Sequence, residues 1–396
     1  MGIYLRILRT PGVARVVVAT VIGRLPIGIS SLAILLFVRE TTGSFASAGL
    51  CAGALALGSA AGAPLQGRLV DRRGQGSLLP LAVAHAAGLV AIWVLGAGGA
   101  PVAPLALVSL LTGAALPPLT SVLRSRWPYL LDAELVPGAY AFDSVLVELI
   151  FVTGPLVTTA VVATVGPEYA LAVSATCVLS GTVTMLAGLR DKAGPERSSP
   201  AERALGLGAL AAPGLRTLVV ASLPVGFALG TLEVVLPAFS QDEGSKVLAG
   251  VLLAIWSAAS GAGGLLYGTR AFRLPLSEVH LRLAMVLPLA CGVLFAASSP
   301  LTMGLLVIVA GVPIAPLIAS RNQLVERVAP KGTATEAFTW PLTALVGGVA
   351  LGAATAGSLV EAYSWTAGVA SAVVVSALGA CVLLARRETL APALAR

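Results

Sequence analysis

The sequence is poor in charge: 11% of its 396 residues are charged, while 57% are hydrophobic. With a mean hydropathy of +0.95, such a chain cannot cover a water-soluble globule with polar side chains. It has only two histidines, His85 and His280, and four cysteines without metal-ligand spacing, which we expect to be packing residues. We find no P-loop and no serine–histidine–acid pattern. We therefore expect no enzyme activity, no cofactor, no metal and no ATP-driven pump.

Long apolar runs take the place of the missing charge. A bilayer core of about 30 Å needs about 20 apolar residues per helical crossing, and lipid offers no partner for an open backbone. The predicted fold class is therefore an all-α membrane protein embedded in the lipid bilayer. Its twelve transmembrane helices are expected at 14–38, 45–66, 78–97, 102–123, 140–163, 169–188, 216–238, 246–267, 279–298, 301–320, 338–360 and 365–385.

The basic residues are unevenly distributed between the two sides of the predicted bundle. If the amino terminus is cytoplasmic, all of the 25 Lys and Arg except Arg24, Arg39 and Lys246 fall on the cytoplasmic side. This is the positive-inside rule, so the net charge of +7 reflects membrane insertion and not a nucleic-acid partner. The excess of Arg over Lys is typical of a GC-rich bacterial genome. We predict a multi-pass protein of the bacterial inner membrane, monomeric, with both termini cytoplasmic.

The two halves of the chain repeat each other. Shifted by 196 residues, "LPPLTSVLRSRW" from Leu116 lies over "VPIAPLIASRNQ" from Val312, and a shift of 201 aligns Gly67 with Gly268. A segment rich in Pro, Gly, Ser and charge separates the halves, as a linker does. We therefore expect two pseudo-symmetric six-helix bundles at 1–189 and 215–396, with a cytoplasmic linker at 190–214.

One charged stretch, "GRLVDRRGQG" from Gly67 to Gly76, interrupts the apolar sequence between the second and third predicted spans. Its glycine, Asp-Arg pair and second glycine resemble motif A of the major facilitator superfamily, and paired six-helix bundles are typical of secondary transporters. The resemblance implies a transporter whose latch on the cytoplasmic side holds the outward-facing state. The matching residues are Gly67, Asp71, Arg72 and Gly74.

The residues present allow such a latch. Asp71 near the positive end of span eleven would gain about 0.3–1 kcal/mol from the helix dipole. Thr333 and Glu336 have the spacing of a capping box at that helix start. Arg72 or Arg73 is then expected to pair with Glu336. The alternative is that these charges only anchor a loop in water and fix the topology.

In the second copy of this stretch, Phe272 stands where the first copy has Asp71. A phenyl ring accepts no hydrogen bond from a helix terminus. We therefore expect a weak latch, or none, in the carboxyl-terminal half.

A few charges lie inside predicted spans, where each costs about 2.5–3.5 kcal/mol and needs a partner or a hydrated cavity. Arg24 and Glu148 both fall near the membrane midplane and are predicted to form an ion pair. Glu233 lies in the outer half of span seven and suits proton binding. The functional interpretation assigns these three residues to proton or substrate coupling; the alternatives are a static pair and solvation from the outer vestibule. Asp143 is expected at the interface, and His85 as a packed histidine.

Span five also contains Gly154-Pro155, which resembles the centre of the antiporter motif of drug exporters in the same superfamily, although Ile150 replaces the preceding glycine. Pro155 is expected to kink this helix. The leading hypothesis is therefore a secondary transporter that exports an amphipathic small molecule or drug in exchange for protons by alternating access. The alternatives are uptake of a small organic anion held by Arg24, and a non-transporting receptor or scaffold.

The central faces of spans one, four, seven and ten should line the transport cavity. They are mostly apolar, which fits a greasy substrate better than a sugar. Their expected polar points are Ser30, Ser31, Ser109, Thr112 and Thr231.

Overall fold

A computed structural model describes the chain at residues 2–190, 208–244, 246–270, 272 and 274–390. Within these ranges, twelve helices are long and apolar enough to cross a bilayer, and each overlaps one predicted span. The all-α membrane fold is thereby confirmed. Several of the crossings extend past their predicted ends, because their last turns carry charged residues that hydropathy had assigned to loops.

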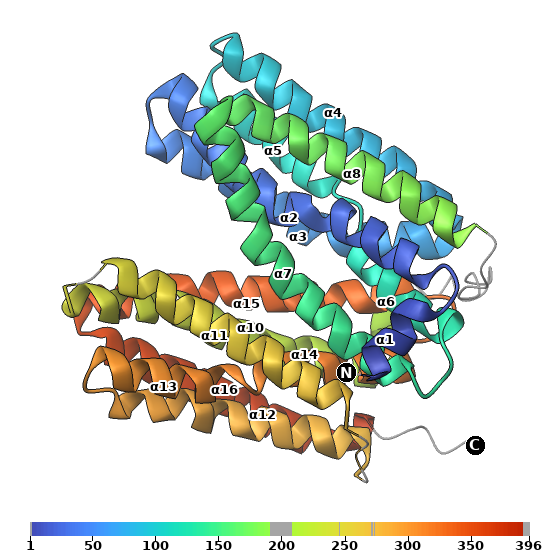
Figure 1. Cartoon of the computed structure of the whole chain (residues 1–396), viewed down its shortest axis with the longest axis vertical. Coiled ribbons are helices and arrows are strands. Elements are labelled where there is room, and N and C mark those ends of the chain that lie inside the picture. Colours follow the sequence, from blue (N-terminus) through green and yellow to red (C-terminus); the bar gives the residue numbers. More distant parts are fainter. Residues whose placement is uncertain (1, 191–207, 245, 271, 273, 391–396) are drawn as a thin grey trace.

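The first six crossings lie together in the upper group of helices in Figure 1. A short helix, α1 (Gly2–Arg9), precedes them. Their helices are α2 (Val13–Thr42), α3 (Phe45–Arg73), α4 (Leu78–Ala97), α5 (Val102–Ala114) with α6 (Leu119–Leu130), α7 (Val136–Thr164) and α8 (Pro167–Leu189).

The last six crossings form the lower group, which we call the second bundle (Figure 1). Most of the predicted linker lies outside the described residues, and its described end forms the short turn η2 (Gly208–Ala211). The helices of this bundle are α10 (Pro213–Asp242), α11 (Lys246–Gly268), α12 (Leu276–Gly292), α13 (Pro300–Gly311) with α14 (Ile314–Val328), α15 (Ala334–Ala362) and α16 (Trp365–Ala385).

The fourth and tenth crossings are each broken in two, which the apolar runs did not predict. Pro117 and Pro118 separate α5 from α6, and Pro313 separates α13 from α14. Proline donates no backbone hydrogen bond and disfavours helix in the residue before it. Since Pro117 and Pro313 are partners in the 196-residue repeat, the break is a shared feature of the two halves.

Glycine lets two helices of the first bundle approach closely. A Cβ atom added to Gly154 of α7 would lie 2.6 Å from the Cα of Gly28 on α2. Such contacts replace the hydrophobic effect as a source of packing energy in lipid. Helix α7 continues through Pro155, so the kink expected there stays a prediction.

The two bundles meet on one face of the membrane. An even number of crossings puts both chain ends on the same face, which we call the terminal face; α1 and α6 lie there, and the two groups of ribbons diverge toward the opposite side (Figure 1). The Tyr4 hydroxyl of α1 donates to the Leu265 carbonyl of α11 at 2.6 Å, and burial raises the pKa of Tyr4 to about 12, so it stays a neutral donor. The rings of Tyr140 and Phe338 lie 5.9 Å apart across the same interface.

Candidate functional site

Asp71 joins the bundles by capping a helix of the other half. Its carboxylate accepts hydrogen bonds from the backbone N–H groups of Thr335 at 2.9 Å and Glu336 at 2.7 Å. These N–H groups belong to the first turn of α15, where no residue of the helix itself can accept from them. The buried carboxylate also meets the positive end of the helix dipole. This contact matches the position expected from the sequence.

The arginine that completes this contact is Arg68 and not Arg72 or Arg73. Arg68 Nη2 lies 2.7 Å from Oε1 of the buried Glu336, while the side chains of Arg72 and Arg73 are exposed. Because α3 continues to Arg73, Arg68 and Asp71 stand three residues apart and are neighbours on the helix surface.

The capping box expected at Thr333 and Glu336 is also absent from the structure. Thr333 makes no side-chain bond to the start of α15. Asp71 of the first bundle supplies the acceptor for the N–H groups at the start of α15. The Glu336 carboxylate instead accepts from Arg68 and from the Trp340 indole N–H at 3.2 Å. A side chain from the first bundle therefore caps the amino-terminal end of α15.

Glycines make this contact close. A Cβ on Gly67 would lie 2.9 Å from the Cα of Glu336, so only glycine lets α3 approach α15 here. Gly74 ends α3 with φ of 83°, a left-handed conformation that glycine adopts without strain. Gly208, with φ of 54°, places the described end of the linker against the Glu336 carboxylate. We call Gly67, Arg68, Asp71, Gly74 and Glu336 the terminal latch.

The second half has no acidic counterpart of this latch at Phe272. The Phe272 ring packs on Tyr267 with centroids 5.0 Å apart, and the aligned Gly268 lies against Tyr4 and Ala141 of the first half. On this side the bundles are therefore joined by packing and by the Tyr4 hydrogen bond.

A buried triad of charges lies inside the first bundle, and it corrects the predicted Arg24–Glu148 pair. Arg24 Nη1 is 2.6 Å from Asp143 Oδ1, and Arg124 Nε is 2.6 Å from Asp143 Oδ2. All three side chains are at most 3% exposed, so Asp143 is not interfacial as expected. One carboxylate thus serves two guanidinium groups and leaves a net positive charge in the helix bundle.

Arg321 of α14 adds a further buried cation that the sequence analysis assigned to the cytoplasmic side. It is 4% exposed, and its guanidinium donates to Ser222 Oγ at 3.3 Å and Asn322 Oδ1 at 3.2 Å. Among the described residues no carboxylate lies within ion-pair distance of it, and it is close enough to Arg124 for mutual repulsion. The predicted spans ended at 123 and 320, one residue before Arg124 and Arg321, because charge was taken as the boundary. The repeat offered a signal, since it aligns these two arginines within one position of each other.

Glu148 bridges the two bundles without a basic partner. Its carboxylate accepts from the Ser257 hydroxyl of α11 at 2.9 Å and from Ser260 at 3.4 Å. Glu148 is partly buried, and Glu233 of α10 is exposed and close enough to repel it electrostatically. Two carboxylates from opposite halves therefore share one region of the interface, and no described Lys or Arg forms an ion pair with either.

Most of the polar points expected in the cavity are satisfied inside the bundles. Ser30 bonds to Ser174 at 2.7 Å, and Ser109 and Thr112 donate to carbonyls of their own helix. Thr231 is buried, with a 3.4 Å contact to Gly352, and of the five only Ser31 is exposed. His85 is packed as expected, with Nδ1 2.8 Å from the Thr112 carbonyl. The central faces are thus more apolar than the sequence suggested.

Two six-helix units are typical of secondary transporters, the class in which such units move against each other around a central site. The Major Facilitator Superfamily model matches residues 16–340, and the chain belongs to this family of transporters. No curated protein is similar enough in sequence to serve as a relative.

A bacterial homologue of the iron transporter ferroportin in an outward-facing state superposes with a TM-score of 0.77 at 13% identity, covering 95% of this chain and 99% of that one. The human organic anion transporter MFSD10 gives 0.71 at 17% identity, covering 94% and 99%. The proton:xylose symporter XylE gives 0.65 at 14% identity, covering 94% and 95%. At these identities the likeness shows the fold alone.

Proposed function

We propose that this protein is a proton-coupled exporter that moves an amphipathic small molecule across the bacterial inner membrane by alternating access. Both termini and the terminal face are then cytoplasmic, and the structure is the outward-facing state. The observation that carries the proposal is the Glu148 carboxylate, which is held between the bundles by Ser257 and Ser260 and faces Glu233.

The contact links protonation to conformation. The serine hydroxyls lie on α11 and reach Glu148 only while α7 packs against that helix. Hydrogen bonds to an ionised group contribute about 1.5–3 kcal/mol each, more than bonds to the neutral acid. The ionised carboxylate thus stabilises the closed terminal face, and protonation from the outside weakens this contact and favours reopening toward the cytoplasm.

The substrate class follows from the lining. Four of the five expected polar points are satisfied within the bundles, so the central faces offer mainly apolar surface together with the two carboxylates. An amphipathic molecule, and a cationic one in particular, suits that combination better than a sugar.

The alternative function, uptake of a small organic anion, would depend on Arg321 instead of Arg24. Arg24 is paired with Asp143, whereas the buried Arg321 has no carboxylate partner among the described residues. An anion could compensate Arg321 if the terminal face opened. The same fold in an organic anion transporter is compatible with this second candidate.

Transport in proteoliposomes tests both candidates. Vesicles with an imposed pH gradient are loaded with ethidium, an amphipathic cation, or with carboxyfluorescein, an anion. We expect proton-driven ethidium movement, abolished in Glu148→Gln and strongly reduced in Glu233→Gln. Glu361→Gln, which changes an exposed carboxylate at the end of α15, is the matched control and should behave as wild type.

Two results would reject the leading proposal. One is proton-driven transport that survives in Glu148→Gln. The other is carboxyfluorescein movement, lost in Arg321→Gln, in the absence of ethidium movement, which would favour the anion candidate.

A further inference from the structure

A deep groove lies on the outside of the second bundle, away from the charged interface. Helices α11 and α12 both pack on α14 and leave between them a space of about 680 Å³, within the range of small-molecule sites. The break at Pro313 forms part of its floor. The groove is a separate feature from the central site, because its lining includes no residue of α7 or α10, while Glu148 lies on α7 and Glu233 on α10.

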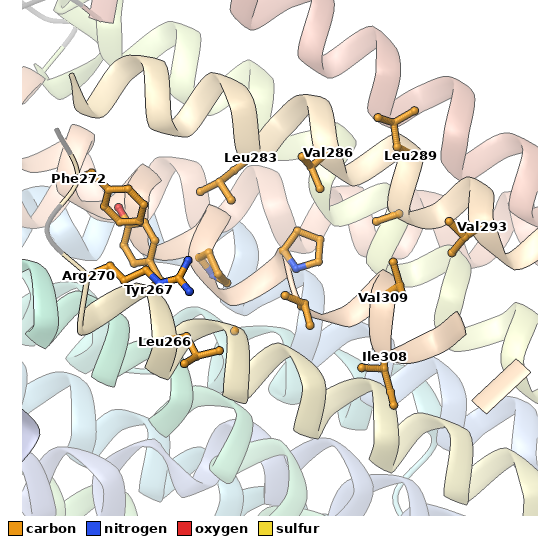
Figure 2. Close-up of a pocket in the computed structure, with 15 residues that line it drawn as sticks. Leu266, Tyr267, Arg270, Phe272, Leu283, Val286, Leu289, Val293, Ile308 and Val309 are labelled. Carbon is orange, nitrogen blue, oxygen red and sulfur yellow. The ribbon is translucent and has the colours of Figure 1, made fainter. Parts of the chain in front are cut away.

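The groove has one polar end and a long apolar body. Figure 2 shows Arg270 with Tyr267 and Phe272 at one end, and Val293, Ile308 and Val309 toward the other. From Leu283 to Ala290 the α12 wall extends about 10 Å at the helical rise. The remaining lining is aliphatic, so a water-soluble ligand would find few hydrogen-bond partners along it.

The position of the groove decides what can enter it. Val286, Leu289 and Ile308 on its rim are exposed although they belong to membrane-spanning helices, so they face hydrocarbon. Arg270 lies two residues beyond the end of α11, at the terminal face, next to the tilted ring pair of Tyr267 and Phe272. Aromatic and basic side chains at that depth lie at the level of lipid headgroups.

Arg270 carries the charge at the polar end of the groove, and its side chain is accessible to a ligand. Arg270 is exposed, and among the described residues no carboxylate lies within ion-pair distance of it. By contrast Arg282 on α12 is paired with Glu278 at 2.9 Å. A guanidinium group binds phosphate well, and basic pockets between membrane helices are suited to anionic headgroups.

We propose that this groove binds one anionic phospholipid, with an acyl chain along α12 and the headgroup phosphate on Arg270. The site requires both parts: the apolar body selects a chain, and the single arginine selects the charge. It is independent of the transported substrate and of the proton-coupling residues.

Lipid retention by the full-length protein tests the proposal. The detergent-purified protein is mixed with equal amounts of phosphatidylglycerol and phosphatidylcholine with identical chains, and bound lipid is counted by native mass spectrometry. We expect one phosphatidylglycerol per chain to be retained preferentially. Arg270→Gln should reduce that preference about five-fold, the effect of one basic residue at an anionic surface. Arg216→Gln removes another exposed arginine, at the start of α10, and should leave the preference unchanged.

A second pair of variants tests the apolar body. Val309→Trp places a large side chain at a position 48% exposed on the groove rim, and should reduce retention of both lipids. Val183→Trp makes the same change at a position 52% exposed on α8 and should have no effect. Equal retention of the two lipids by wild type, equal effects of Arg270→Gln and Arg216→Gln, or full retention in Val309→Trp would each overturn the proposal.

Discussion

Asp71→Asn should shift the protein from the closed toward the open state of the terminal face. The carboxylate accepts two backbone hydrogen bonds at the start of α15, at 2.9 and 2.7 Å. Asparagine keeps one oxygen acceptor but loses the charge, and it brings an NH₂ group against a backbone N–H. The loss of one charge-assisted bond and of the dipole interaction is about 2 kcal/mol.

This energy gives a measurable change in population. About 2 kcal/mol corresponds to roughly a thirty-fold change in an equilibrium constant. If the open state is about 1% of wild type, it becomes about 23% of the variant.

Distances between spin labels at Gly76→Cys and Lys331→Cys, in a background without the native cysteines, would report the separation of α3 and α15 at the terminal face; both positions are exposed. We expect a second, longer distance in Asp71→Asn. Arg72→Gln, which neutralises an exposed charge of the same stretch, should leave the distribution unchanged. A wild-type distribution in Asp71→Asn, or an equal shift in Arg72→Gln, would refute the reasoning.

Three further substitutions test neighbouring contacts. Gly67→Val should open the latch in the same distance measurement, because even its Cβ would lie 2.9 Å from the Glu336 Cα, whereas Gly49→Val has open space and should not. Glu336→Gln removes a 2.7 Å ion pair with Arg68, whose side chain is partly exposed. The shift in the distance distribution should therefore be smaller than in Asp71→Asn. Asp143→Asn leaves two buried guanidinium groups uncompensated and should cost about 3–5 kcal/mol, seen as a lower thermal midpoint; Asp242→Asn, at an exposed site, should leave the midpoint unchanged. A midpoint unchanged in Asp143→Asn would contradict the role of the triad.

The latch shows how far sequence reasoning reaches into the site. The spacing of Gly67 and Asp71 predicted a contact with the start of span eleven, and the structure has that contact. The prediction that Arg72 or Arg73 pairs with Glu336 was wrong, because the charged stretch was treated as a loop. Once α3 is known to continue to Arg73, Arg68 becomes a candidate as well, because it stands three residues before Asp71 on the same helix.

The partners of the buried charges were not predicted from the sequence. Arg24 and Glu148 were paired because both lie at similar depth, yet Arg24 binds Asp143, and Glu148 binds serines of the other bundle. Arg124 and Arg321 were placed outside the membrane because they follow apolar runs directly. Hydropathy did not mark the extra turns of α6 and α14 that carry them into the interior; the near-alignment of the two arginines in the repeat was the one signal.

Composition and the length of the apolar runs by themselves predicted the twelve membrane-spanning helices found in the described part of the chain, since lipid admits only segments that satisfy their own backbone, and the internal repeat predicted two related halves. The mean hydropathy of a segment indicates whether that segment crosses the membrane. It carries no information about the direction in which a side chain points around the helix axis. Only the tertiary structure therefore decided which carboxylate meets which guanidinium, which serines hold Glu148, and where a groove lies between the helices of the second bundle.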